Sequence, residues 1–230
     1  MRQTMDRART EGVSAVIVSD QAGILYARSI GLEVHISTQL NLSNLESVAF
    51  YAQFADVMVL ARELTIPQVR AIYDGIRERN ICGPGGEPVR IEMFAHGALC
   101  MAISGKCYLS LHDTGCSANR GAYRQLCRRS YEVRDRDSGT ELVIDNHYIM
   151  SPKDLCTIDF LDKFLGAGVR VLKIEGRARS AEYCIFTPVF FAPFRFSSRI
   201  LYDILYDCLK VARERVSRSF TSPQGGSTHA

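Results

Sequence analysis

The sequence predicts an α/β fold built on a parallel β-sheet. Short β-branched runs alternate with amphipathic stretches over residues 13–95, and the same rhythm resumes over residues 151–174. Of the 230 residues, 47% are hydrophobic and 23% are charged, which is enough apolar material for a core. A helix between two strands returns the chain to the same edge of the sheet, so the strands are parallel. Such crossovers are right-handed. Two architectures are open: an open parallel sheet, or an eight-stranded barrel that has lost its first strands.

The first half of the chain supplies four strands. We expect them over residues 13–19, 32–37, 56–61 and 90–95. Helices with apolar residues at helical spacing are expected over residues 21–30, 44–54 and 65–79. Asp20 is a typical N-cap, Gly31 suits the position after a helix, and Pro67 favours a first turn.

The second half divides into four segments. Residues 96–146 are rich in glycine, cysteine and arginine, and we expect a long irregular insertion there, since such loops are usually functional. A helix capped by Ser151 and running to Leu165 follows, then a fifth strand over residues 169–174. These parts make one domain over residues 1–184. A divergent helical segment over residues 185–218 and a disordered tail over residues 219–230 complete the expected organisation.

Composition and charge narrow the function classes. The formal net charge of +3 does not by itself indicate nucleic acid as a partner. No stretch approaches the roughly 18 apolar residues of a membrane span, and the first ten residues lack an apolar leader segment. We therefore expect a cytoplasmic protein without a membrane partner. In that reducing compartment the eight cysteines are expected to be thiols or metal ligands.

Cysteines form the most informative constellation. Five of them fall within and just after the expected insertion: Cys100, Cys107, Cys116, Cys127 and Cys156. Thiolates at irregular spacing suit zinc or an iron–sulfur cluster, although small buried apolar residues are an equally good interpretation of the spacing alone. The remaining cysteines lie apart and are expected to be structural or incidental: Cys82, Cys184 and Cys208.

The residues around these cysteines resemble a known family. Glu92-Met-Phe-Ala-His-Gly-Ala-Leu-Cys100, followed by Ser104-Gly-Lys-Cys107-Tyr-Leu-Ser110, resembles the signature of the peptidase U32 family, the collagenase-like proteases. The resemblance spans roughly residues 10–184. It continues in order through Ser37-Thr-Gln39, Ala61-Arg-Glu-Leu64, Ser117-Ala-Asn-Arg-Gly121, Cys127-Arg128, Met150-Ser-Pro-Lys-Asp-Leu-Cys156 and Lys173-Ile-Glu-Gly-Arg177.

The resemblance implies a fold, a cofactor and a reaction. The family has a barrel-like catalytic region, so we expect a TIM-barrel-like (β/α) fold that is incomplete because its first strands are lacking. Members that hydroxylate tRNA or rRNA imply a [4Fe–4S] cluster, a prephenate-type oxygen donor and an RNA substrate. By position, the implied ligands are Cys100, Cys107, Cys127 and Cys156.

Two departures from the family pattern keep alternatives open. In the first, Tyr123 stands where members often carry a cysteine, and Cys116 is a candidate to compensate. The second departure is length, because the resemblance begins partway into the family's domain. The family's namesake activity, peptide-bond hydrolysis, is the alternative reaction, with a peptide as substrate. An inactive, truncated family member is the third interpretation.

Polar residues near the expected strand ends are the other site candidates. Four are assigned to catalysis: Glu92, His96, Lys173 and Glu175. The carboxyl ends of parallel strands carry the chemistry in such folds, whereas ordinary ion pairs are the alternative interpretation. Five residues are assigned to substrate binding, with the arginines meeting RNA phosphates: Gln39, Asn41, Arg120, Arg128 and Arg177.

Overall fold

The computed structural model describes most of the chain. The described residues are 1–118, 124–143, 153–176, 179–180, 182–183, 187 and 191. The chain divides into two units, Met1–Glu175 and Gly176–Ala230. The sheet, its helices and the site all belong to the first unit. In the second unit, the guanidinium of Arg179 stacks 5.3 Å from the ring centroid of Tyr183.

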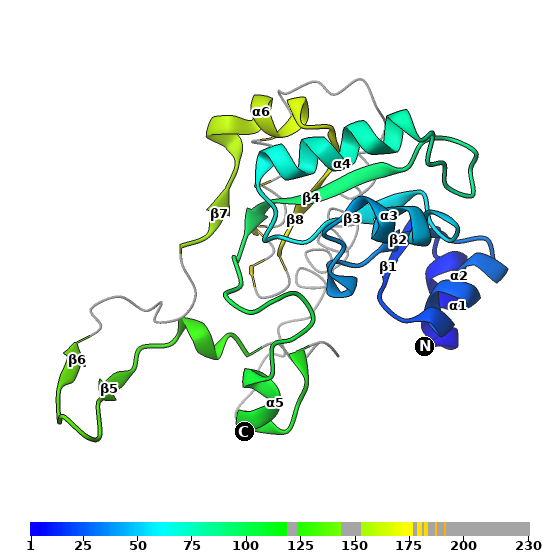
Figure 1. The fold of residues 1–230 in the computed structure, drawn as a ribbon. Helices are drawn as coiled ribbons and strands as arrows, with labels where there is room; N and C mark the ends of the chain where they lie inside the picture. Colours follow the sequence, from blue (N-terminus) through cyan, green and yellow to red (C-terminus); the bar gives the residue numbers. More distant parts are fainter. Residues whose placement is uncertain are drawn as a thin grey trace, which may run out of the picture. The chain divides into compact units, whose positions relative to one another are not determined.

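The five predicted strands are parallel and belong to a six-stranded sheet (Figure 1). Their bounds are β1 (Ala15–Val18), β2 (Glu33–Ile36), β3 (Val57–Val59), β4 (Arg90–Gly97) and β8 (Val169–Ile174). They lie in the order β1-β2-β3-β4-β8, every neighbouring pair being parallel. Over the described residues this sheet does not close. The α/β class is therefore confirmed, and the TIM barrel stays a prediction.

Helices connect successive strands. The main helices are α1 (Arg2–Thr10), α2 (Gln21–Ser29), α3 (Leu45–Ala52), α4 (Ile66–Glu78) and α6 (Leu161–Gly166). The predicted cap Asp20 begins α2, where its side chain accepts from Gly23 N at 2.8 Å, and Asn44, which was not predicted as a cap, begins α3 by accepting from Ser47 N at 2.8 Å. Thr65 and Gln68 form a capping box at the start of α4. The helix α1 was not predicted, and it buries no residue.

The core lies on both sides of the central strands. All three residues of β3, Val57, Met58 and Val59, are fully buried. A parallel strand needs cover on both faces, which explains why this sequence is a continuous apolar run rather than an alternating one. In Figure 1, α4 and α6 lie side by side, and residues of the two helices are in contact.

The prediction of a helix over residues 151–165 is wrong for residues 153–157. Instead, a short strand, β7 (Leu155–Cys156), runs antiparallel to the end of β4, and Thr157 N donates to Ala95 O at 3.0 Å. Pairing between β3 and β4 stops at Glu92, so the last residues of β4 offer backbone groups that β7 satisfies. A 3-10 turn, η4 (Ile158–Phe160), then leads into α6.

The insertion over residues 96–146 is less irregular than expected. It contains the short helix α5 (Leu109–Thr114), the 3-10 turn η3 (Leu126–Arg128) and an antiparallel hairpin of β5 (Glu132–Arg134) and β6 (Glu141–Val143). Ser151, the predicted helix over residues 185–218 and the predicted tail over residues 219–230 lie outside the described residues. No helix in the described part of the chain has the length and apolar character to span a bilayer.

The contact between β8 and α4 gives a stability prediction. Gly168 has φ +99°, and a Cβ there would lie 2.1 Å from Tyr73 Cγ. Gly168→Ala should therefore lower the free energy of unfolding by about 2–4 kcal/mol, from backbone strain plus overpacking. The matched control is Gly166→Ala, where a Cβ meets nothing within 4 Å. Urea denaturation compares the two variants, and an equal effect in both would contradict the packing geometry.

Candidate functional site

A buried ion cluster joins three strands of the sheet. Glu92 on β4 is completely buried, and its Oε2 lies 2.6 Å from His35 Nδ1 on β2. Its other oxygen, Oε1, lies 3.6 Å from Lys173 Nζ on β8. Parallel register places these side chains together, because β8 is the direct neighbour of β4 and β3 alone separates β4 from β2. The predicted catalytic residues Glu92 and Lys173 are thus in contact.

The surroundings of His35 favour its protonated form. Burial alone lowers the pKa of His35, but its contacts with Glu33 and Glu92 outweigh burial, and the net result is a raised pKa. The hydrogen bond to His35 in turn lowers the pKa of Glu33, against the opposing effect of burial and with help from Arg90. The cluster therefore places the His35 ring between two carboxylates, with Nδ1 at 2.6 Å from Glu92 Oε2 and Nε2 at 3.7 Å from Glu33 Oε1.

Two cations flank the ring of Phe94, at the same end of β4. The Cζ of Arg62 lies 5.3 Å from the ring centroid, and the Nζ of Lys173 lies 5.1 Å from it. Phe94 itself is buried. Arg62 follows the end of β3, whereas Lys173 belongs to β8, so the cations reach the ring from the two strands that flank β4.

A buried serine connects the loop that carries Cys100 and Cys107 to residues just beyond β2 and β3. Ser104 Oγ lies 3.2 Å from Thr38 Oγ1 and accepts from Arg62 Nη2 at 3.3 Å. The next residue, Gly105, has φ +78°, and a Cβ there would lie 2.8 Å from the backbone O of Gln39. Since only glycine allows this approach, the Ser104-Gly105 pair fixes the loop against the 3-10 turn η1 (Thr38–Leu40).

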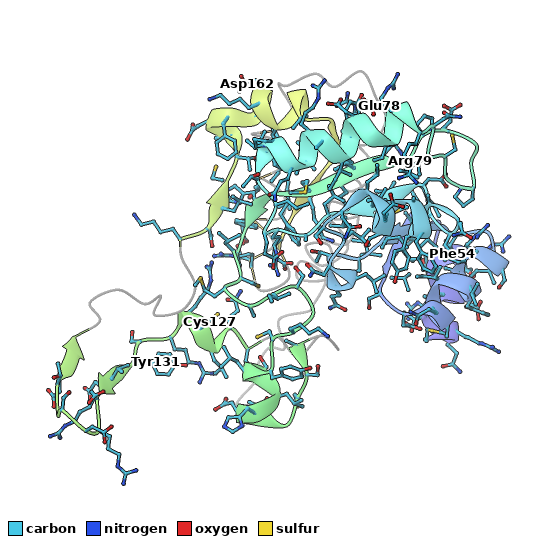
Figure 2. All side chains as sticks on the ribbon, viewed as in Figure 1. Phe54, Glu78, Arg79, Cys127, Tyr131 and Asp162 are labelled. Atoms are coloured by element: carbon cyan, nitrogen blue, oxygen red, sulfur yellow. The ribbon has the colours of Figure 1, made fainter. Side chains whose placement is uncertain are left out.

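Three of the predicted ligand cysteines are close enough to interact electrostatically. The pKa of Cys127 is raised, first by burial and then by the charges of Cys100 and Cys107, with Arg128 acting in the opposite direction. All three cysteines are half-buried. Figure 2 labels Cys127, which lies in η3 just before the β5–β6 hairpin.

The fourth predicted ligand, Cys156, has a different environment. It is exposed on β7, opposite His96 in the antiparallel pairing with β4. In residues 1–118, 124–143 and 153–176, no three His, Cys, Asp or Glu side chains are arranged as metal ligands. The four-thiolate site therefore stays a prediction, whose donor chemistry fits and whose ligand geometry is not formed in this structure.

The remaining site candidates have varied surroundings. Gln39 is half-buried in η1, and Asn41 is exposed with φ +53°, a turn conformation that asparagine tolerates. Arg128 donates to Asp154 at 2.6 Å and its side chain is only 7% exposed, so this arginine is engaged within the chain. Glu175 N donates to His96 O at 2.9 Å, which places these two candidates side by side. Arg120, Tyr123 and Arg177 lie outside the described residues.

Three residues of this site were not predicted from the sequence. His35 occupies the middle of a buried strand, and a polar residue in such a run is the signal that could have revealed it. Arg62 comes shortly after β3, in the position where strand-end residues carry function. Ser104 was recognised only as part of a motif, whereas the structure shows the hydrogen bonds it makes.

These features define a class of protein. It is an α/β protein that carries charged and cysteine side chains on its strands and in the loops that follow them. The family model described as "Peptidase family U32" matches residues 1–190. The chain therefore belongs to peptidase family U32, and the resemblance identified in the sequence is confirmed.

Relatives in this family carry two kinds of name. The chain is 64% identical over 183 residues to a "Collagenase" of Porphyromonas gingivalis, covering 80% of this chain and 44% of that protein. It is 36% identical over 178 residues to "tRNA hydroxylation protein P1" of Bacillus subtilis, covering 74% and 40%. It is also 40% identical over 173 residues to "23S rRNA 5-hydroxycytidine C2501 synthase" of Escherichia coli, covering 75% and 24%.

The chain spans half or less of the length of these curated relatives. No solved structure matches it. Family membership makes an enzyme the expected class, and the names of the relatives divide between peptide and RNA chemistry.

The raised pKa of His35 predicts a pH-dependent stability. A group whose pKa is higher in the folded protein stabilises it most below its unfolded pKa, about 6.5, and that stabilisation is lost as the pH rises through the folded value. His35→Gln should therefore destabilise the protein by roughly 3 kcal/mol near pH 6, because Glu92 loses a buried partner. The loss should be smaller near pH 9.

Denaturant unfolding at the two pH values measures this difference. The control is His112→Gln, since His112 is exposed on α5. A destabilisation by His35→Gln that stays constant from about pH 6 to about pH 9 would contradict the charged state of His35.

Proposed function

We propose that this chain is the cofactor-binding part of a U32 enzyme that hydroxylates a base of tRNA or rRNA. The observation that carries the proposal is that Cys100 and Cys107 both act on the pKa of Cys127, in the segment of the chain that follows β4. Two relatives whose names state RNA hydroxylation, at 36% and 40% identity, support the RNA substrate.

The donor set suits a [4Fe–4S] cluster, which takes four thiolates. Cys100 and Cys107 raise the pKa of Cys127, because neighbouring thiolates repel one another. A positively charged metal centre removes that repulsion, so a group of half-buried thiols with mutually unfavourable charges is well suited to bind one. In the proposal Cys156 on β7 completes the set.

Protein groups beside the thiols have separate roles in this proposal. A bound cluster would supply the activation of an oxygen donor, for which a prephenate-type compound is the family's implied candidate. Ser104 holds the loop of Cys100 and Cys107 in place through Thr38 and Arg62. Glu92 Oε2 keeps the proton on His35 Nδ1. Thr38 and Arg62 lie just beyond β2 and β3, at the edge of the sheet where a base would be positioned, and Glu92 and His35 lie within the strands below them.

Peptide hydrolysis is the second candidate, and the 64% identity to a protein named collagenase favours it. His35 and Glu92 form a histidine–carboxylate pair of the kind that activates a nucleophile. The other ring nitrogen, Nε2, faces Glu33 at 3.7 Å rather than a serine or cysteine. This arrangement gives hydrolysis less support than the thiols give the cluster.

Iron and sulfide analysis of anaerobically purified protein tests the proposal. We expect about four irons per chain. Cys100→Ser, Cys107→Ser and Cys127→Ser should each remove most of the iron, since each would take away a thiolate ligand. Cys82→Ser is the matched control, because Cys82 is not among the groups that shift the pKa of Cys127, and its thiol contacts Asn80 Oδ1.

Two outcomes would decide against this function. Equal iron loss in Cys82→Ser would show that the ligand assignment is wrong. A metal-free wild-type protein that cleaves peptides would replace RNA hydroxylation with hydrolysis.

A further inference from the structure

Exposed apolar side chains gather on the loop that carries Cys100 and Cys107. Nine large hydrophobic side chains are exposed in the described part of the chain, and four of them, each between 42% and 65% exposed, fall within residues 101–111. Such a concentration marks an interaction surface, whereas single exposed apolar residues do not. Lys106 is exposed on the same segment. We call this set the loop surface: Met101, Ile103, Lys106, Tyr108 and Leu111.

Contacts on the inner side of the loop turn these side chains outward. Ser104 is 1% exposed and is hydrogen-bonded to residues just beyond β2 and β3. Lys106 N donates to Ile103 O at 2.9 Å, which closes a tight turn around Ser104. The middle of the turn therefore faces the sheet, while Ile103 and Lys106 at its two ends are exposed. The loop surface is ordered before a partner arrives, which lowers the entropic cost of binding.

The loop surface adjoins the thiols of the proposed cluster. Met101 directly follows Cys100, and Tyr108 directly follows Cys107. Both cysteines act on the pKa of Cys127, so their two segments converge on one place. Since neighbouring Cα atoms are about 3.8 Å apart, a molecule seated on Met101 and Tyr108 is brought next to the thiols.

Residues 98–131 carry an excess of positive charge. They contain five basic residues and one acidic residue, Asp113, whereas the whole chain has a formal net charge of only +3. The basic residues are Lys106, Arg120, Arg124, Arg128 and Arg129. This excess is complementary to a polyanion such as RNA, whose phosphates attract cations along their length.

Two of these arginines are exposed in the segment that follows α5. Arg124 N donates to Ser110 Oγ at 3.2 Å, which brings this exposed arginine beside the helix that Tyr108 begins. Arg129 is exposed two residues beyond Cys127. Arg128 is instead engaged in an ion pair within the chain. The exposed cations therefore lie next to the apolar side chains of the loop surface.

We propose that the loop surface binds an unpaired stretch of the RNA substrate. One base stacks on the ring of Tyr108, and Met101 and Ile103 pack against the next base. Lys106 and Arg124 contact the phosphates that join these nucleotides. The stretch is unpaired because the bases of a duplex are stacked on one another and do not reach an aromatic side chain. The choice of RNA rests on the proposed function, but binding at this surface does not require iron.

A second copy of this chain is the other candidate occupant. A two-fold dimer would place the loop surface against itself, so that Lys106 and Arg124 of one copy would face the same cations of the other. Like charges brought together in this way oppose association. A single strand of RNA brings the opposite charge, and the charge excess therefore favours RNA.

Fluorescence anisotropy of a labelled single-stranded RNA of about ten nucleotides measures binding to the full chain. Binding should be saturable, and an RNA duplex of the same length should bind more weakly. Tyr108→Ala should weaken binding of the single strand about ten-fold, whereas Tyr108→Phe keeps the ring and should bind as the wild type does. The matched control is Phe50→Ala on α3, because Phe50 is 56% exposed and Tyr108 62%.

The salt dependence of binding tests the phosphate contact separately. Lys106→Gln should lower the slope of log K against log salt concentration by about 0.7, the value for one phosphate contact to a single strand. Tyr108→Ala should leave that slope unchanged, since stacking releases no counterion. Lys163→Gln on α6 is the matched control, because Lys163 is also an exposed lysine, and it should change neither the affinity nor the slope.

Three results would overturn the inference: no saturable binding of the single strand, equal affinity for the duplex, or equal weakening by Tyr108→Ala and Phe50→Ala. Sedimentation of the same proteins tests the other occupant. A wild-type dimer that Tyr108→Ala dissociates, without RNA binding, would assign the loop surface to a second copy.

Iron analysis of the same samples separates this inference from the proposed function. Tyr108→Ala should keep the wild-type iron content, which shows that the loop is still folded. Binding of the single strand by an iron-free wild-type protein would reject the cluster and keep the loop surface. An iron-containing protein that does not bind the single strand would reject the loop surface alone.

Discussion

The burial of one carboxylate constrains much of this structure. Glu92 lies in the middle of β4 without exposure to solvent, where an ionised carboxylate is costly unless cations accompany it. His35 on β2 and Lys173 on β8 supply them. Each cation comes from a different strand, so the ion cluster is satisfied only when β2, β4 and β8 are in their observed register. Removing one partner leaves a buried charge without a counterion. A sheet assembled in another register would therefore be destabilised.

The same constraint reaches the cysteine loop through Arg62 and Phe94. Phe94 follows Glu92 by two residues on β4, and Arg62 bridges its ring to Ser104. Ser104 also contacts Thr38, just beyond β2. The loop that carries Cys100 and Cys107 is thus anchored to side chains beyond β2 and β3 before any cofactor is considered. Preorganisation of this kind lowers the cost of gathering thiolates, because the backbone is already ordered.

Local patterns predicted the regular part of the fold. The strands were apolar runs, and Asp20 and Pro67 indicated the starts of the helices that contain or follow them, because helix starts are determined by neighbouring residues. Residues 153–157 were misassigned to a helix. Their conformation depends on pairing with the end of β4, a partner about sixty residues earlier that no local pattern reveals.

Site residues were likewise predicted where local sequence motifs indicate them, and missed where distant neighbours determine their role. Motif resemblance and strand-end position proposed Cys100, Cys107, Cys127, Glu92 and Lys173, because these residue types often carry chemistry. They did not assign His35, Arg62 or Ser104 to the site, because the contacts of these residues come from three-dimensional neighbours. Conversely, Arg128 was predicted from the sequence to contact RNA, whereas in the structure its guanidinium donates a hydrogen bond to Asp154.

Parallel strand order explains why loops that follow different strands meet at one edge of the sheet. All parallel strands direct their carboxyl ends the same way, so every loop that follows a strand reaches that edge. The ion cluster uses residues within and just beyond the strands, where burial makes charge pairing strong. The thiols of Cys100, Cys107 and Cys127 lie beyond β4 and are half-buried. The buried charges fix the positions of the strands, and the loop that carries Cys100 and Cys107 is in turn held against residues beyond β2 and β3 by Ser104.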